Sequence, residues 1–148
     1  MGHTGRGYTI LDTNDLGETK SISESIDYYS GVRRPLWFVF SGMGSQWPGM
    51  GADLMRIPTF AKAIERCHKV LEPKGVDIVK IISEPDKTIF DNILNAFVGI
   101  GAVQIGLTDI LKEMGLEPDY IIGHSLGEMA CAYQDNTFTV EELVLATY

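Results

Sequence analysis

The feature that most constrains the fold is the stretch at residues 120–128, which reads YIIGHSLGE. Its apolar start predicts a buried β-strand. A Gly-x-Ser-x-Gly motif follows at Gly123, Ser125 and Gly127, and the apolar residues after it recur at helical spacing. A strand, a tight turn with a central serine, and a helix form the context that a nucleophile elbow requires.

Two interpretations of Ser125 follow from this motif. In an elbow the turn strains the serine backbone, and the flanking glycines avoid side-chain clashes. The hydroxyl then stands at a helix N-terminus, where free N–H groups and the helix dipole favour developing negative charge. Ser125 is therefore a candidate nucleophile. Alternatively, the serine only caps a core helix, and the bare motif leaves both interpretations open.

Composition narrows the class of protein. The chain has 148 residues with 45% hydrophobic and 22% charged residues, which is typical of one globular domain with a sizeable core. The net charge of −8 argues against a general nucleic-acid surface, which needs a basic face. Cys67 and Cys131 are far apart in apolar helical patterns and predict reduced core thiols. The histidines and cysteines do not cluster, so no metal site is predicted.

The N-terminus and the apolar segments of the chain indicate the cellular compartment in which we expect the protein. No run of about 18 apolar residues occurs, so no membrane span is expected. The first six residues lack the apolar segment of a secretory signal. We therefore expect a cytoplasmic protein.

The composition changes near residue 35. Residues 1–34 are polar; a strand at residues 7–11 lacks an obvious partner, and residues 19–31 predict a linker. Residues 36–40 are continuously apolar and predict a central strand of a parallel sheet covered by helices on both faces. The predicted fold class is α/β.

A glycine-rich loop at residues 41–51, SGMGSQWPGMG, follows this strand. It lacks the Gly-Lys-Ser/Thr of a P-loop and the spacing of a dinucleotide fingerprint, so phosphate binding is disfavoured. Its backbone N–H groups suit an oxyanion hole opposite the serine elbow. An ordinary surface loop is the alternative.

Several helices are predicted between and after these motifs. Pro58 suits the first position of a helix that runs to Leu71. Residues 95–114 predict a buried helix whose glycines permit close packing on the sheet. Thr88-x-x-Asp91 resembles a capped helix start, and residues 139–142 form a capping box that begins the last helix.

A serine nucleophile needs a base to accept its proton, and the sequence offers none that is suitably placed. His3 lies in a tail, and His124 adjoins Ser125, where neighbouring side chains of an extended strand point to opposite faces. His68 lies in the helix that starts at Pro58. We therefore expect this chain to be the N-terminal part of a larger catalytic domain.

Three segments together resemble a known family. Residues 41–51, residues 102–107 (AVQIGL) and residues 123–128 are similar to the malonyl/acetyl-transferase domain of animal-type fatty acid synthase, and polyketide synthase acyltransferases share the pattern more loosely. The resemblance implies part of an α/β-hydrolase-like parallel-sheet acyltransferase domain, truncated before its ferredoxin-like subdomain. It assigns residues 35–148 to that domain. Residues 1–34 would be the end of the ketosynthase–acyltransferase linker.

The resemblance also implies a chemistry. Ser125 would attack the thioester of malonyl-CoA or acetyl-CoA, and the backbone N–H groups of Met43 and Leu126 would hold the oxyanion. The phosphopantetheine thiol of an acyl carrier protein would then accept the acyl group, with no cofactor bound in this segment. The other residues expected at the substrate are Gly42, Gly44, Gln46 and His124.

The same resemblance implies that some catalytic groups lie elsewhere. The family's carboxylate-binding arginine and catalytic histidine are expected beyond residue 148, so the isolated chain should be inactive or nearly so. The parent protein would be a homodimeric synthase. A serine esterase or lipase, and a non-catalytic truncated product, are the alternative functions.

Overall fold

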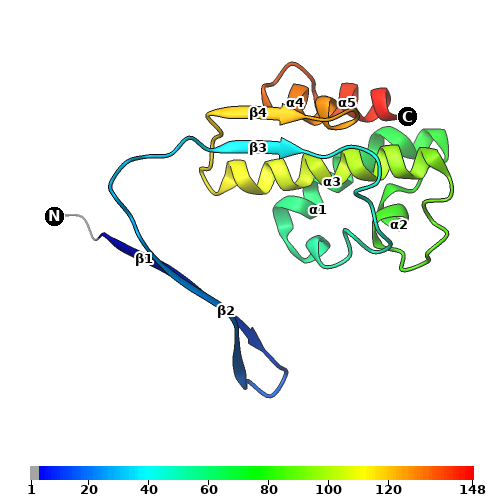
Figure 1. The fold of residues 1–148 in the computed structure, drawn as a ribbon. Helices are drawn as coiled ribbons and strands as arrows, with labels where there is room; N and C mark the ends of the chain where they lie inside the picture. Colours follow the sequence, from blue (N-terminus) through cyan, green and yellow to red (C-terminus); the bar gives the residue numbers. More distant parts are fainter. Residues whose placement is uncertain (1–3) are drawn as a thin grey trace. The chain divides into compact units, whose positions relative to one another are not determined.

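The computed structural model describes residues 4–148, and the chain divides into two compact units, Met1–Arg34 and Pro35–Tyr148. The first unit is a hairpin of two strands, and the second contains two short strands and several helices (Figure 1). The second unit contains the serine motif, and its mixture of strands and helices confirms the predicted α/β class.

The N-terminal unit is an antiparallel hairpin of β1 (Gly5–Thr13) and β2 (Thr19–Tyr28), with Gly5 opposite Tyr28 and a register shift between Ile10 and Leu11. The expectation that residues 19–31 lack regular structure is therefore wrong for most of their length. Backbone pairing with β1 supplies the order that burial does not, because nearly every residue of both strands is exposed.

Hydrogen bonds within the turn of the hairpin set the pairing of its two strands. The side-chain oxygen of Asn14 accepts hydrogen bonds from the backbone N–H groups of Leu16 and Glu18, at 3.0 and 2.9 Å. Gly17 supplies a positive φ of 80°, which costs glycine little. These local bonds fix the turn and so the register.

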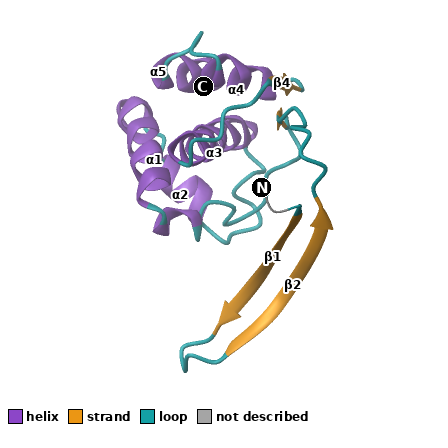
Figure 2. Cartoon of the chain, turned by 90° about the vertical axis from the view of Figure 1, so that its left-hand side faces the viewer, coloured by secondary structure: helices purple, strands orange, loops and turns teal. Residues whose placement is uncertain are grey.

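The C-terminal unit contains a parallel pair, β3 (Trp37–Phe40) and β4 (Tyr120–Gly123), with Trp37 opposite Tyr120. The pair is parallel as predicted, but it is not covered on both faces. Phe38 and Phe40 are buried, whereas Trp37, Val39, Tyr120 and Ile122 are 51–76% exposed. The helices lie to one side of these strands (Figure 2), so the described residues cover only one face.

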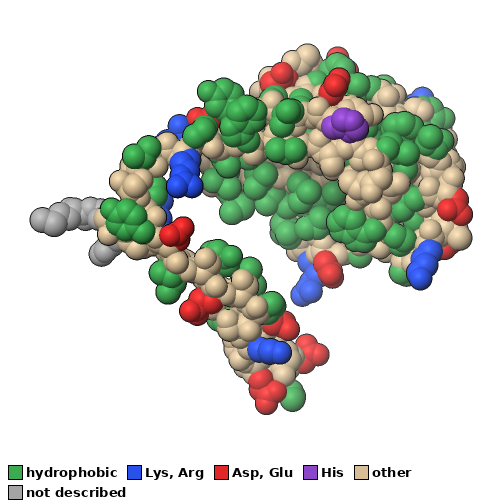
Figure 3. All heavy atoms as spheres, viewed as in Figure 1, with side chains coloured by type: hydrophobic (Ala, Val, Ile, Leu, Met, Phe, Trp, Pro, Cys, Tyr) green, Lys and Arg blue, Asp and Glu red, His purple; other side chains and the backbone are tan. Residues whose placement is uncertain are grey.

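The surface of this unit is rich in apolar side chains. Figure 3 shows hydrophobic side chains gathered over much of the face in view, with charged groups scattered between them. Apart from the strand residues, the large exposed side chains include Trp47 at 61% and Ile93 at 61%. Exposed apolar groups are therefore not confined to the open face of the strand pair.

The helices occupy the rest of the unit. In chain order they are η1 (Leu54–Arg56), α1 (Pro58–Leu71), η2 (Glu72–Lys74), α2 (Ile78–Ser83), α3 (Ile93–Glu113), α4 (Gly127–Gln134) and α5 (Val140–Thr147). The predicted helices from Pro58 to Leu71 and over residues 95–114 are confirmed, the second starting two residues earlier.

The glycines of α3 allow close packing, but against helices rather than the sheet. A β-carbon on Gly106 would lie 2.4 Å from the ring of Phe60 in α1. One on Gly101 would lie 3.1 Å from Leu143 in α5. The main core therefore forms where α1, α2 and α5 surround α3.

Helix α3 is also the one described helix that is long and apolar enough to cross a membrane by length and composition. Of its most apolar window, 61% is buried inside the unit. That burial is typical of a core helix.

The helix ends test the predicted caps. The capping box of α5 is confirmed, since Thr139 and Glu142 exchange side chain-to-backbone hydrogen bonds. The predicted start at Thr88 is wrong, because α3 begins after Asn92, whose side chain accepts from the N–H of Leu94 at 3.0 Å. Asn92 lies directly before the apolar run and caps the helix by itself, so the helix does not start at the Thr-x-x-Asp pattern.

Candidate active site

Ser125 occupies a strained turn between β4 and α4. Its φ is 55°, in the left-handed region that residues with a side chain rarely adopt. Strand β4 ends at Gly123 and α4 begins at Gly127, so the sharp reversal is completed within the motif. The strand, turn and helix follow one another as the motif predicts.

The two flanking glycines allow this turn to close. A β-carbon on Gly123 would lie 2.5 Å from the carbonyl oxygen of Gly127. A β-carbon on Gly127 would lie 2.2 Å from the carbonyl oxygen of Phe40 in β3. Both distances are far below van der Waals contact, so any larger residue would open the elbow or push it away from the sheet.

The alternative role of Ser125 as a helix cap is not seen. The N-cap of α4 is Leu126, and no side chain caps this helix. The carbonyl of Ser125 accepts a hydrogen bond from the N–H of Glu128 at 3.0 Å, while its side chain lies exposed without a hydrogen-bond partner among residues 4–148. The hydroxyl is thus free for chemistry.

The glycine-rich loop lies directly against this elbow. A β-carbon on Gly42 would lie 3.3 Å from Cβ of Ser125 and 2.6 Å from the carbonyl oxygen of His124. The N–H of His124 donates to the carbonyl of Phe40 at 3.1 Å. This hydrogen bond extends the pairing of β3 and β4 by one residue, to the start of the loop. Two motifs about 80 residues apart in the chain (residues 42 and 125) therefore form one site.

The predicted oxyanion donors are next to this contact. Met43 follows Gly42, and Leu126 follows Ser125. Within the described part of the chain, neither backbone N–H donates a hydrogen bond. Leu126 is buried, whereas the Met43 side chain is partly exposed. Both unpaired amides thus follow directly in the chain after the two residues that meet at this contact, and their role as oxyanion donors stays a prediction.

The loop is held by side chains that sequence reasoning did not single out. The Ser45 hydroxyl donates to the carbonyl of Gly42 at 2.8 Å. The Gln104 amide, from α3, donates to the carbonyl of Ser41 at 2.7 Å. Gln104 carried a signal that was available in the sequence, since it is a polar residue in an otherwise apolar helical run.

Gly44 and Gln46, which are predicted to contact the substrate, are hydrogen-bonded to each other in this structure. The side-chain oxygen of Gln46 accepts from the N–H of Gly44 at 2.8 Å, which closes the loop on itself. Gly44 has a φ of 96°, which favours glycine at this bend. Contact of either residue with a substrate stays a prediction.

His124 and Ser125 both lie against the glycine-rich loop at Gly42. Strand β4 ends one residue before His124, at Gly123. A β-carbon placed on Gly42 would lie 3.4 Å from the His124 Nδ1 and 3.3 Å from the Ser125 Cβ, so both groups border the same position. No hydrogen bond joins His124 to Ser125 within the described residues. His3 lies outside them.

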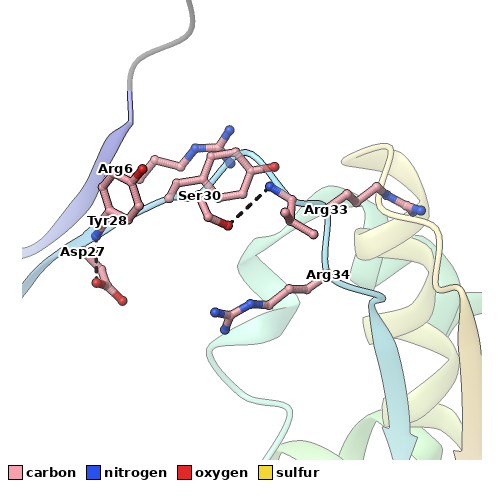
Figure 4. Close-up of a pocket in the computed structure, with 8 residues that line it drawn as sticks. Arg6, Asp27, Tyr28, Ser30, Arg33 and Arg34 are labelled. Carbon is pink, nitrogen blue, oxygen red and sulfur yellow. Dashed lines mark hydrogen bonds between the residues drawn. The ribbon is translucent and has the colours of Figure 1, made fainter.

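Two cavities lie away from the serine hydroxyl. One, of about 270 Å³, runs between β3 and α3 and is lined by Ser41, Gln104 and apolar side chains. The other, of about 380 Å³, belongs to the N-terminal unit and is lined by arginine, tyrosine, Asp27 and Ser30 side chains (Figure 4). There the Arg6 guanidinium stacks over the Tyr29 ring at 3.6 Å from the ring centroid.

Comparison with known proteins points to one family. The sequence profile described as "Acyl transferase domain" matches residues 37–148. The highly reducing polyketide synthase alnA of Emericella nidulans is 39% identical over 114 residues, which cover 75% of this chain and 5% of that protein.

Solved structures agree with this match. The acyltransferase domain of the polyketide synthase PpsC of Mycobacterium tuberculosis is 32% identical with a TM-score of 0.67, covering 76% of this chain and 34% of that one. The malonyl-CoA:ACP transacylase of Synechocystis sp. is 30% identical with a TM-score of 0.66, covering 75% and 36%. The chain therefore spans about a third of these solved chains and one twentieth of the curated relative.

Proposed function

The chain belongs to the acyl transferase domain family, and on that premise we propose that it moves a malonyl or acetyl group from coenzyme A to an acyl carrier protein through Ser125. The observation that carries the proposal is the contact of Gly42 with Ser125, 3.3 Å from a β-carbon position on Gly42 to Cβ of the serine. It brings together a strained, exposed serine and the loop that carries the unpaired N–H of Met43.

The first half-reaction acylates the serine. The Ser125 oxygen attacks the thioester carbonyl carbon and gives its proton to a base. The carbonyl oxygen becomes an oxyanion, which the N–H groups of Met43 and Leu126 stabilise. When the tetrahedral intermediate collapses, the carbon–sulfur bond breaks and coenzyme A leaves as a thiol after taking a proton.

The second half-reaction reverses these steps with a new thiol. The phosphopantetheine sulfur of the carrier protein attacks the acyl ester, the carbon–oxygen bond to Ser125 breaks, and the serine recovers its proton. Gly42, Gly44, Gln46 and His124 border the space in which the acyl group would lie. The catalytic base and the arginine for the malonyl carboxylate are expected from residues outside this chain.

The parent protein is proposed to be a cytoplasmic multidomain synthase. The resemblance of residues 41–51 to the animal-type fatty acid synthase supports a parent protein of that kind, which would act as a homodimer. The relative alnA is a polyketide synthase, so a polyketide synthase is the second candidate. In both, residues 1–34 would form the end of the linker before the acyltransferase domain.

Mass spectrometry of the 148-residue chain with malonyl-CoA tests the proposal. Because the chain offers no histidine hydrogen-bonded to Ser125 within the described residues, we expect slow acylation that added imidazole accelerates by replacing the missing base. Pantetheine should then remove the malonyl group as a thioester. Ser125→Ala should abolish labelling at this site.

Three outcomes separate the alternatives. Malonyl label on residues other than Ser125, or none with imidazole present, would contradict the proposal. Release of free malonate without transfer to pantetheine would favour an esterase. Rapid stoichiometric acylation without imidazole would show that this chain already contains a working base.

A further inference from the structure

We propose that Ser45 and Gln104 are positioning residues that fix the direction of the Met43 N–H at the acyl-transfer site. The claim that these residues affect acylation rests on the proposed function. The claim that they fix the loop rests on the hydrogen bonds described below. It concerns two side chains that have no expected contact with the substrate.

The Ser45 hydroxyl acts through a single peptide unit. The carbonyl of Gly42 and the N–H of Met43 belong to the same planar trans peptide, so they point in opposite directions. The Ser45 hydroxyl donates to that carbonyl at 2.8 Å. Because the unit is rigid, holding its oxygen on one side holds the Met43 N–H on the other, with the N–H left unpaired among the described residues.

Gln104 anchors the preceding peptide unit. Its side-chain N–H donates to the carbonyl of Ser41 at 2.7 Å, across 63 residues of sequence. A carbonyl oxygen only accepts hydrogen bonds, so the nitrogen of the Gln104 amide must face it. Two consecutive peptide units, Ser41–Gly42 and Gly42–Met43, are thus tied to side chains before the chain reaches the Met43 amide.

The energetics of Gln104 indicate a role other than stability. The residue is only 8% exposed and lies on the apolar helix α3. Its side-chain oxygen is buried without a partner in the described residues, and an unpaired buried polar atom costs about 1–3 kcal/mol. An apolar residue of similar size would avoid that cost, so the hydrogen bond to Ser41 is what the glutamine adds.

The loop needs such anchors because its own sequence is permissive. Gly42 and Gly44 give the backbone wide conformational freedom, and residue 42 must be glycine because a β-carbon there would lie 2.6 Å from the carbonyl oxygen of His124. An oxyanion donor is effective only when it is held in place before the reaction. The hydrogen bonds from the Ser45 and Gln104 side chains restrain the loop backbone, which the glycines would otherwise leave flexible.

Acylation kinetics of the 148-residue chain with malonyl-CoA and imidazole test the catalytic part. Gln104→Met and Ser45→Ala remove the donors at nearly constant size. We expect each to lower the rate constant at saturating malonyl-CoA on the order of 10- to 100-fold, with little change in the half-saturating concentration. Ser45→Thr, which keeps the hydroxyl, should recover most of the rate.

Gln134→Met is the matched control, because it makes the same change at another glutamine with an unpartnered buried oxygen, at the end of α4. It should acylate like the unmodified chain. If Gln104→Met and Ser45→Ala acylate at the unmodified rate while Ser125 is still labelled, the inference is wrong and the proposed function stands.

Amide hydrogen exchange tests whether Ser45 and Gln104 hold the loop, and this measurement does not require the chain to be acylated. In Ser45→Ala and Gln104→Met, the loop amides from Gly42 to Gln46 should exchange faster than in the unmodified chain and in Gln134→Met, with exchange in α1 and α3 unchanged. Unchanged exchange of these loop amides would overturn the inference, even if Ser125 were never acylated. Failure of Ser125 labelling in the unmodified chain would instead contradict the proposed function.

Discussion

Gly42 lies so close to Ser125 that a β-carbon added to it would stand 3.3 Å from the serine Cβ and 2.6 Å from the carbonyl oxygen of His124. The second distance is shorter than van der Waals contact and involves backbone, which cannot rotate away. The loop and the elbow can therefore stay together only with glycine at residue 42.

Gly42→Ala tests this contact directly. The added methyl group should push the loop from the elbow and so lower the rate of Ser125 acylation on the order of 100-fold, as expected when one oxyanion donor is lost. Intact mass spectrometry with malonyl-CoA and imidazole measures the rate. Gly5→Ala is the control, since a β-carbon there meets nothing within 4 Å; equal rates in the two variants would contradict the prediction.

Gly106→Ala tests the packing of α1 on α3. The new β-carbon would lie 2.4 Å from the Phe60 ring, and overpacking of this kind typically costs about 1–3 kcal/mol. Urea unfolding followed by helix circular dichroism measures the loss. The double variant with Phe60→Leu should lose less than the sum of the two single changes, and simple additivity would show that the two residues do not compete for space.

Thr139→Ala tests the cap of α5. It removes the side-chain acceptor for the N–H of Glu142 and should lower the free energy of unfolding by about 1 kcal/mol. Thr139→Ser keeps the hydroxyl and should stay close to the unmodified chain. A loss of the same size in both variants would mean that packing of the threonine methyl group, and not the cap, is responsible.

Cys67 should make stability fall at alkaline pH. Burial in the core raises the pKa of its thiol to about 12 from 9.0, because the charged thiolate is poorly solvated there. The unfolded chain therefore releases this proton at lower pH than the folded chain, so the free energy of unfolding should drop as pH rises above about 9.

Urea unfolding at a series of pH values measures this slope. Burial also raises the pKa of Tyr133, with a hydrogen bond to Asp109 adding to the effect, so part of the alkaline loss should remain in Cys67→Ala. The slope of that variant should nevertheless be shallower. An unchanged slope would mean that Cys67 ionises equally in the folded and unfolded states.

Several local signals in the sequence were confirmed because each depends on residues within one short segment. Pro58 begins α1 as predicted, because its fixed φ suits the first turn. Thr139 and Glu142 cap α5 through bonds that span three residues. The Gly-x-Ser-x-Gly motif likewise contains the strain it predicts, since Ser125 has a positive φ.

Other features depend on which segments meet. Strand β2 was missed because its order comes from pairing with β1 and not from burial. The exposed faces of Trp37 and Tyr120 could not be predicted from an apolar run, which is the same whether one or both faces are covered.

The sequence alone was sufficient to predict a serine on a sharp turn between a strand and a helix, and a glycine-rich loop after the first strand of the pair, because the residues of each motif are adjacent in the chain. Only the tertiary structure brought Gly42 against Ser125 and placed Gln104 on the Ser41 carbonyl, 63 residues away. The reason is physical: steric strain and capping act within a few residues, whereas close contacts between distant segments exist only after the helices have packed.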